Sequence, residues 1–326
     1  MISCPSLRGM RRGQVETPMV MIFAVTAGVM ILLVIAYFVL RQQDGATSAQ
    51  ELEALAQIRD SIASMQGSIG VTQNISLGGG PYTMRCDDLN DGELFIGTVE
   101  GDETSLRGLL VAAPRIISSG VLTVTTAPAS NAFRIGTFVY ALPIGSSITR
   151  GDDVPTMPFL TKLGNPGEIE HTFADGKTTT ITVAPDPSAE QAGTITFDDG
   201  VNPPEDKFYI DSSLLASAAA TGDADLYSCA LDRYVQLLAF NNALQHRRLL
   251  ELRQSAIDSG STCVDIYDGE AFAEIETILG TTPTLTPLPK GRELDLQDVV
   301  DIASAMERIQ NLNGRLIRGD RCATVS

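Results

Sequence analysis

A run of 23 residues without a charged side chain, Pro18–Leu40, constrains this chain more than any other feature. At about 1.5 Å per residue, a helix of this length is about 35 Å long, enough to cross a bilayer core of about 30 Å. Arg8, Arg11 and Arg12 precede the run, and only Arg41 follows it closely. Because positive charge marks the cytoplasmic side, we expect a single-pass cell-membrane protein whose partner is the lipid bilayer. Its N-terminus should be cytoplasmic and its C-terminal domain extracellular.

The basic leader ends at Gly13-Gln14, a few polar residues before the apolar run. This leader resembles the class III signal sequences of archaeal pilin-like proteins, and the resemblance implies cleavage by a prepilin-type peptidase between these two residues. Counted from Gln14, however, the fifth residue is Pro18 rather than a glutamate, and a plain signal anchor is the alternative. Ala24 and Gly28 form a small-x-x-x-small pair, which predicts self-association through the membrane helix.

The charge balance narrows the choice of partners. The chain carries 40 acidic and 23 basic residues, a net charge of −17, and only four of the basic residues are lysines. Nucleic-acid binding is not expected, because it depends on basic surface. An acidic, lysine-poor surface is typical of a halophilic protein, whose self-repulsion is screened by salt. An ordinary acidic protein from a high-GC genome is the alternative.

Changes of pattern along the chain predict an α+β fold in five parts. A mostly antiparallel, sandwich-like β domain should be followed by a three-helix region. The predicted parts are a basic leader over residues 1–13, a transmembrane helix over 14–41, an amphipathic stalk helix over 42–71, the β domain over 72–212 and the helical region over 213–326.

The segment after the apolar run has a heptad pattern. Leu55, Ile58, Ile62, Met65 and Ile69 follow one another at spacings of three or four residues. This spacing predicts a helix with one apolar face. The helix either forms a stalk that pairs with another copy or packs on its own domain.

Short runs of β-branched and aromatic residues then alternate with turn residues. We predict strands at 82–86, 94–99, 109–117, 121–126, 133–142, 146–149, 169–173, 178–183, 194–197 and 208–210. The proline and acidic clusters between Ala184 and Asp206 are predicted to be loops within the domain. The last third predicts three helices: one over Leu226–Ile257, one capped by Asp268 and ended by Gly280, and one capped by Asp295.

Four cysteines lie in the part expected outside the cell: Cys86, Cys229, Cys263 and Cys322. An even number is compatible with two disulfides. A straight first helix would hold Cys229 and Cys263 about 45–50 Å apart, far beyond the reach of a bridge. Antiparallel second and third helices would return Cys322 to Cys263. The expected pairs are therefore Cys86 with Cys229 and Cys263 with Cys322.

The chain shows no sequence motif for catalysis. It lacks G-x-S-x-G, H-E-x-x-H and a phosphate-binding loop, and neither His171 nor His246 is near a cysteine in sequence. Each histidine is predicted to be a surface or packing residue, and no catalytic residue, metal or cofactor is predicted. Asn74 begins a permissible N-glycosylation sequon.

The span, the β domain and the helical tail with paired cysteines together resemble an uncharacterised family of single-span archaeal envelope proteins. This resemblance implies a structural or interaction protein of the envelope, with pilin-like assembly as one form, that contacts other envelope proteins. The alternative is a ligand-binding ectodomain or a carboxylate-based hydrolase. A deep pocket with convergent carboxylates would favour the alternative.

Overall fold

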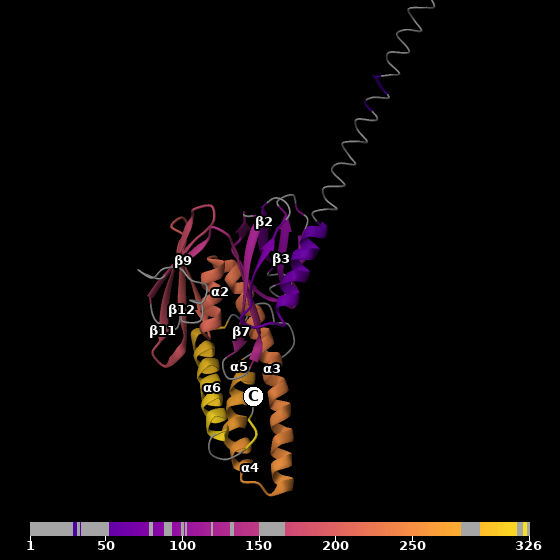
Figure 1. Ribbon diagram of the computed structural model, residues 1–326. Helices are drawn as coiled ribbons and strands as arrows, with labels where there is room; N and C mark the ends of the chain where they lie inside the picture. The colour runs from indigo at the N-terminus through magenta and orange to yellow at the C-terminus, as the bar shows by residue number, and fades with distance from the viewer. Residues whose placement is uncertain are drawn as a thin grey trace, which may run out of the picture. The chain divides into compact units, whose positions relative to one another are not determined.

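The computed structural model divides the chain into two units, Met1–Glu51 and Leu52–Ser326. It describes residues 52–77, 81–87, 93–98, 101, 103–118, 120–130, 134–149, 167–281, 294–317 and 322–324, together with residues 29, 30 and 33. The predicted leader and almost all of the predicted span therefore lie outside the described residues. Within those residues, no helix combines the length and the apolar character needed to cross a membrane. Figure 1 shows the helices and strands of the second unit.

The second unit begins with a helix over residues 52–65, and its apolar face is covered by its own domain. Leu55, Ile58, Ile62 and Met65 are all buried, in one cluster with residues of the β-strands. Ile69, which continues the heptad pattern, lies beyond the helix and is half exposed. The four buried side chains are thus unavailable for pairing with another copy. Of the two interpretations of the pattern, packing on its own domain is the one observed.

A four-stranded sheet forms the middle of the unit. Its strand order is β1 (Thr72–Ser76), β7 (Val121–Ser130), β8 (Arg134–Pro143) and β5 (Leu110–Ala112). The β5–β8 pair is parallel, and all other strand pairs among the described residues are antiparallel. Along β8, Phe138 and Tyr140 point into one core, whereas Val139 and Ala141 point into another. A strand buried on both faces explains why this stretch is continuously apolar.

A second sheet closes the smaller of these two cores. Its order is β4 (Glu103–Ser105), β3 (Glu93–Thr98), β2 (Tyr82–Asp87) and β6 (Ile116–Ile117). Tyr82, Met84 and Ile96 of this sheet are buried in the same cluster as the apolar face of the 52–65 helix.

The third sheet has five strands. Its order is β13 (Glu205–Tyr209), β12 (Ala189–Asp198), β11 (Thr178–Asp186), β10 (Gly167–Thr172) and β9 (Ser147–Thr149). The first cluster between Ala184 and Asp206 was predicted to be a loop, and this prediction is wrong for Pro185 and Asp186, which belong to β11. Strands β11 and β12 form a tight hairpin around Pro187. Asp186 stabilises that hairpin by accepting a hydrogen bond of 2.8 Å from the backbone N–H of Ser188. A register shift after Pro185 accommodates the prolines, which cannot donate to a ladder.

Helix α2 (Ser212–Thr221) lies between the four-stranded and the five-stranded sheets and contacts both. These two sheets therefore do not pack directly on each other, whereas the four-stranded sheet and the β4–β3–β2–β6 sheet share the smaller core. The sequence pattern did not predict α2, since all residues from 213 to 221 are buried and no amphipathic stripe marks it. Its small side chains, mostly Ala and Ser, allow close approach on every side. Asp211 caps its N-terminus and Gly222 its C-terminus.

Three helical segments come next, as expected. The long helix α3 (Ala224–Ser259) is succeeded by a composite helix made of α4 (Cys263–Asp265), the π-helical segment η2 (Ile266–Ala271) and α5 (Phe272–Thr281), and then by α6 (Leu296–Arg315). Asp295 caps α6 as predicted, in a capping box with Asp298. The prediction that Asp268 begins the second helix is wrong, because it lies inside η2 and pairs with Arg253 at 2.8 Å. The hydroxyl of Ser261 instead accepts from the N–H of Cys263.

Both disulfides join the expected cysteines. Cys86 on β2 pairs with Cys229 on α3, and Cys263 pairs with Cys322, each with a Cα–Cα distance of 5.9 Å. The first bridge ties α3 to the sheet, and the second ties the C-terminal segment to the far end of the helical region. A further hydrogen bond of 2.8 Å, from the hydroxyl of Tyr267 to the carbonyl of Ala323, holds the same segment.

Candidate functional site

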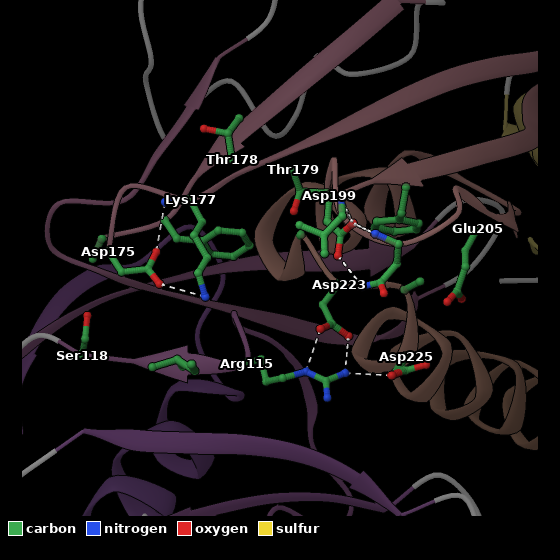
Figure 2. A pocket seen from close by; sticks show the side chains of 18 of the residues that line it. Arg115, Ser118, Asp175, Lys177, Thr178, Thr179, Asp199, Glu205, Asp223 and Asp225 are labelled. Carbon is green, nitrogen blue, oxygen red and sulfur yellow. Dashed lines mark hydrogen bonds and ion pairs between the residues drawn. The ribbon is translucent and has the colours of Figure 1, made fainter.

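A cavity of about 700 Å³ opens where the β10–β11 turn, the β12–β13 turn, β6 and the start of α3 meet (Figure 2). Its volume lies within the range of small-molecule sites. The residues that line it are Arg115, Ile116, Ser118, Phe173, Ala174, Asp175, Lys177, Thr178, Thr179, Phe197, Asp199, Val201, Asn202, Pro203, Glu205, Gly222, Asp223, Ala224 and Asp225. The lining combines five carboxylates with the rings of Phe173 and Phe197, which are called the aromatic floor below.

An ion-paired arginine connects the sheet to the start of α3. The Nε of Arg115 donates to Asp223 at 2.7 Å, and its Nη2 donates to Asp223 at 3.0 Å and to Asp225 at 2.7 Å (Figure 2). Asp223 also caps α3 by accepting from the backbone N–H of Leu226. The hydrogen bond that Arg115 donates to Asp223 is the main reason that the pKa of Arg115 is raised. The arginine therefore keeps its charge and neutralises part of the acidic lining.

The floor of the cavity depends on a glycine. Gly222 has φ +58°, and a Cβ at this position would lie 2.7 Å from the ring of Phe173 and 2.9 Å from Nδ1 of His171. Only glycine combines this backbone with so close a contact. The rings of Phe173 and His171 stack with centroids 4.3 Å apart. Phe173 thus forms part of the floor, and His171 supports it from behind.

His171 is completely buried, and neither ring nitrogen has a hydrogen-bond partner of ordinary geometry. Burial lowers its pKa from 6.5 to about 4, and an interaction with the backbone of Ala219 opposes the shift. The ring is therefore neutral near pH 7.

The β12–β13 turn presents the carboxylate of Asp199. Its Oδ1 accepts hydrogen bonds from the backbone N–H groups of Asn202 at 2.7 Å and Val201 at 2.9 Å. These bonds, first that from Asn202, lower the pKa of Asp199. A carboxylate held ionised in this way can attract a cation but is a poor general acid. Across the cavity, Lys177 lies 3.6 Å from Asp175 in the β10–β11 turn (Figure 2).

The residues predicted as sites lie elsewhere. Gly13, Gln14, Ala24 and Gly28 are outside the described residues, so the structure does not bear on them. Asn74 is exposed on β1, and its side-chain oxygen accepts a hydrogen bond of 3.1 Å from Thr123. The described residues contain no group of three or more His, Cys, Asp or Glu side chains arranged to hold a metal.

None of the cavity residues was predicted as a site residue from the sequence. His171 was expected to be a surface or packing residue, and packing is what is observed. The acidic cluster that includes Asp199 was predicted only as a loop. Arg115 is more than a hundred residues from its two partners, and no local pattern joins them. The Gly222-Asp223 pair is the one local signal, since glycine often ends a helix and aspartate often begins one.

Comparison of the chain with protein-family models, curated proteins and solved structures finds no match. Function is therefore inferred from the cavity and from the sequence.

Proposed function

We propose that the chain is a membrane-anchored, extracytoplasmic binding protein of a cell envelope, and that the cavity at the start of α3 is its ligand site. The cavity carries this proposal, because it brings two aromatic rings and five carboxylates together within about 700 Å³. Such a mixture of apolar walls and a few oriented polar groups is the usual composition of a ligand site. Between the two interpretations of the sequence, this geometry favours a ligand-binding ectodomain over a purely structural role.

The membrane anchor and the outward orientation are supported by the sequence and by the disulfides. The uncharged run Pro18–Leu40 is long enough to span a bilayer, and the arginines before it favour a cytoplasmic N-terminus. Two disulfides within the second unit are typical of an oxidising compartment outside the cytoplasm. A carboxylate-based hydrolase needs a protonated carboxyl group as its general acid, and Asp199, which is held ionised, does not fill that role.

Protease treatment of intact cells tests the topology. We expect residues beyond about 41 to be cleaved and the leader to be protected; protection of the C-terminal part would contradict the proposal. Sequencing of the mature N-terminus adds a second result. Gln14 at that position would support the archaeal pilin-like processing that the leader resembles, and Met1 would support a plain anchor.

A substitution that fills the cavity tests the ligand site. Ala174 lines the cavity on the exposed β10–β11 turn, so Ala174→Trp should fill it without disturbing a core. Ser188→Trp, in the β11–β12 turn, is the matched control. In a thermal-shift screen of small molecules with the full chain, ligands should stabilise the parent and the control but not Ala174→Trp. Equal stabilisation of all three would show that the cavity is not the site.

A further inference from the structure

The cavity keeps an excess of negative charge after its internal ion pairs are counted. Arg115 is shared by Asp223 and Asp225, and Lys177 lies beside Asp175. Glu205 lies 3.6 Å from Lys207, which is outside the lining. The five lining carboxylates therefore face three cations, which leaves two negative charges. One belongs to the carboxylate pair on Arg115, and the other is Asp199.

Hydrogen bonds from its own turn hold the carboxylate of Asp199 in one orientation. The two backbone N–H groups on its Oδ1 and the side-chain amide of Asn202 on its Oδ2, at 2.8 Å, fix its orientation. No ion pair joins Asp199 to a basic side chain among the described residues. A fixed carboxylate loses little conformational entropy when a ligand binds.

The apolar part of the lining is equally well fixed. Phe173 is held between His171 and the bare backbone of Gly222, and Phe197 packs against Tyr227 with ring centroids 5.6 Å apart. The buried, unpartnered Nδ1 of His171 faces the position where a side chain at 222 would lie, immediately behind the floor. Aromatic faces bury apolar groups and also attract cations.

We propose that the cavity binds an organic cation, an ammonium or guanidinium group on an apolar body, with the charge at Asp199 and the Asp223–Asp225 pair and the body on Phe173 and Phe197. This inference rests on the proposed function, since it names the ligand class of the same cavity. Such a cation occurs both as a free amine and as a basic side chain of a peptide.

Three probes of similar size separate charge from shape: phenethylamine, 2-phenylethanol and 3-phenylpropionate. Calorimetric titration of the full chain at low salt should show binding of phenethylamine, binding of the alcohol at least about tenfold weaker, and none of the carboxylate. Added salt should weaken the binding of the cation. Tighter binding of the peptide Ac-Phe-Arg-NH2 than of phenethylamine would identify a peptide segment as the natural source, and weaker binding a free amine.

Asp199→Asn removes the charge but keeps an acceptor for the turn. It should weaken phenethylamine binding about fivefold, at the upper end of what an exposed ion pair contributes. Asp186→Asn is the matched control, because Asp186 accepts from its own turn in the same way but lies outside the cavity. It should leave the affinity unchanged.

The outcomes distinguish the two proposals. If the alcohol or the carboxylate binds as tightly as the cation and Ala174→Trp abolishes that binding, the cation assignment is overturned while the ligand site stands. If none of the probes binds, the cation assignment is likewise overturned. If probes bind but Ala174→Trp has no effect, both the ligand site and the cation assignment fail. Equal affinities of Asp199→Asn and the parent for phenethylamine would also overturn the assignment.

Discussion

Lowering the pH from about 7 to about 4.5 should destabilise the folded chain through His171. Its imidazole is completely buried on β10 against Phe173, and neither ring nitrogen has a hydrogen-bond partner of ordinary geometry. A protonated ring there would be a buried charge, and the interaction with the backbone of Ala219 offsets only part of the cost of its desolvation. Burial accordingly lowers the pKa of His171 from 6.5 to about 4.

The sign and size of the effect are set by proton linkage. In the unfolded chain His171 binds its proton near pH 6.5, whereas in the folded chain it does so only near pH 4. Between these values the unfolded state holds more protons, so the free energy of unfolding falls as the pH falls. The slope approaches about 1.4 kcal/mol per pH unit, and the full loss below pH 4 is about 3 kcal/mol. Above about pH 7 the group contributes no pH dependence.

Urea unfolding of the purified full chain, followed by circular dichroism at several pH values across this window, measures the effect. His171→Phe removes the titrating group and keeps a ring against Phe173, so its stability should depend less on pH between about 6.5 and 4.5. Carboxylates contribute equally to both proteins and cancel in the difference. His246→Gln, at the half-buried second histidine on α3, is the control for removal of an imidazole elsewhere in the chain.

Parallel curves for the parent and His171→Phe would refute the reasoning. If His171→Phe does not fold, NMR titration of the parent gives an independent answer, because the chain has only two histidines. An imidazole assigned to His171 that titrates near pH 6.5 in the folded protein would show that burial does not control its pKa.

Three further predictions concern stability and are measured by the same unfolding assay. Gly222→Ala should cost about 3 kcal/mol, from strain at positive φ and the clash with the aromatic floor, whereas Gly200→Ala, at φ +70° with open space around it, should cost about 1 kcal/mol. Similar costs for the two would argue against the clash. Asp211→Ala removes the cap of α2 and leaves a buried tyrosine hydroxyl unpartnered, so a loss of about 3 kcal/mol is expected; a loss below about 1 kcal/mol would contradict this role. Replacing Cys263 and Cys322 together by serine opens a loop of 59 residues and should cost about 4 kcal/mol, and an unchanged urea midpoint would contradict that assignment.

The sequence alone determined the elements whose patterns are local. Asp295 and the apolar spacing after it predicted α6, because a cap and a 3.6-residue period are properties of one segment. Alternation and turn residues predicted most strands. The disulfide pairing could also be predicted from the sequence, since a long straight helix cannot bring Cys229 close to Cys263 and antiparallel second and third helices return Cys322 to Cys263.

The tertiary structure decided what depends on distant segments. Helix α2 is buried on all sides between two sheets, and a helix without an exposed face has no amphipathic pattern to reveal it. The 52–65 helix had a clear apolar face, but only packing showed that its own domain covers that face. The cavity joins Arg115 to Asp223 across 108 residues, together with two hairpin turns. A binding site is assembled from segments that are distant in sequence. No periodic pattern in the sequence marks the residues that folding brings together.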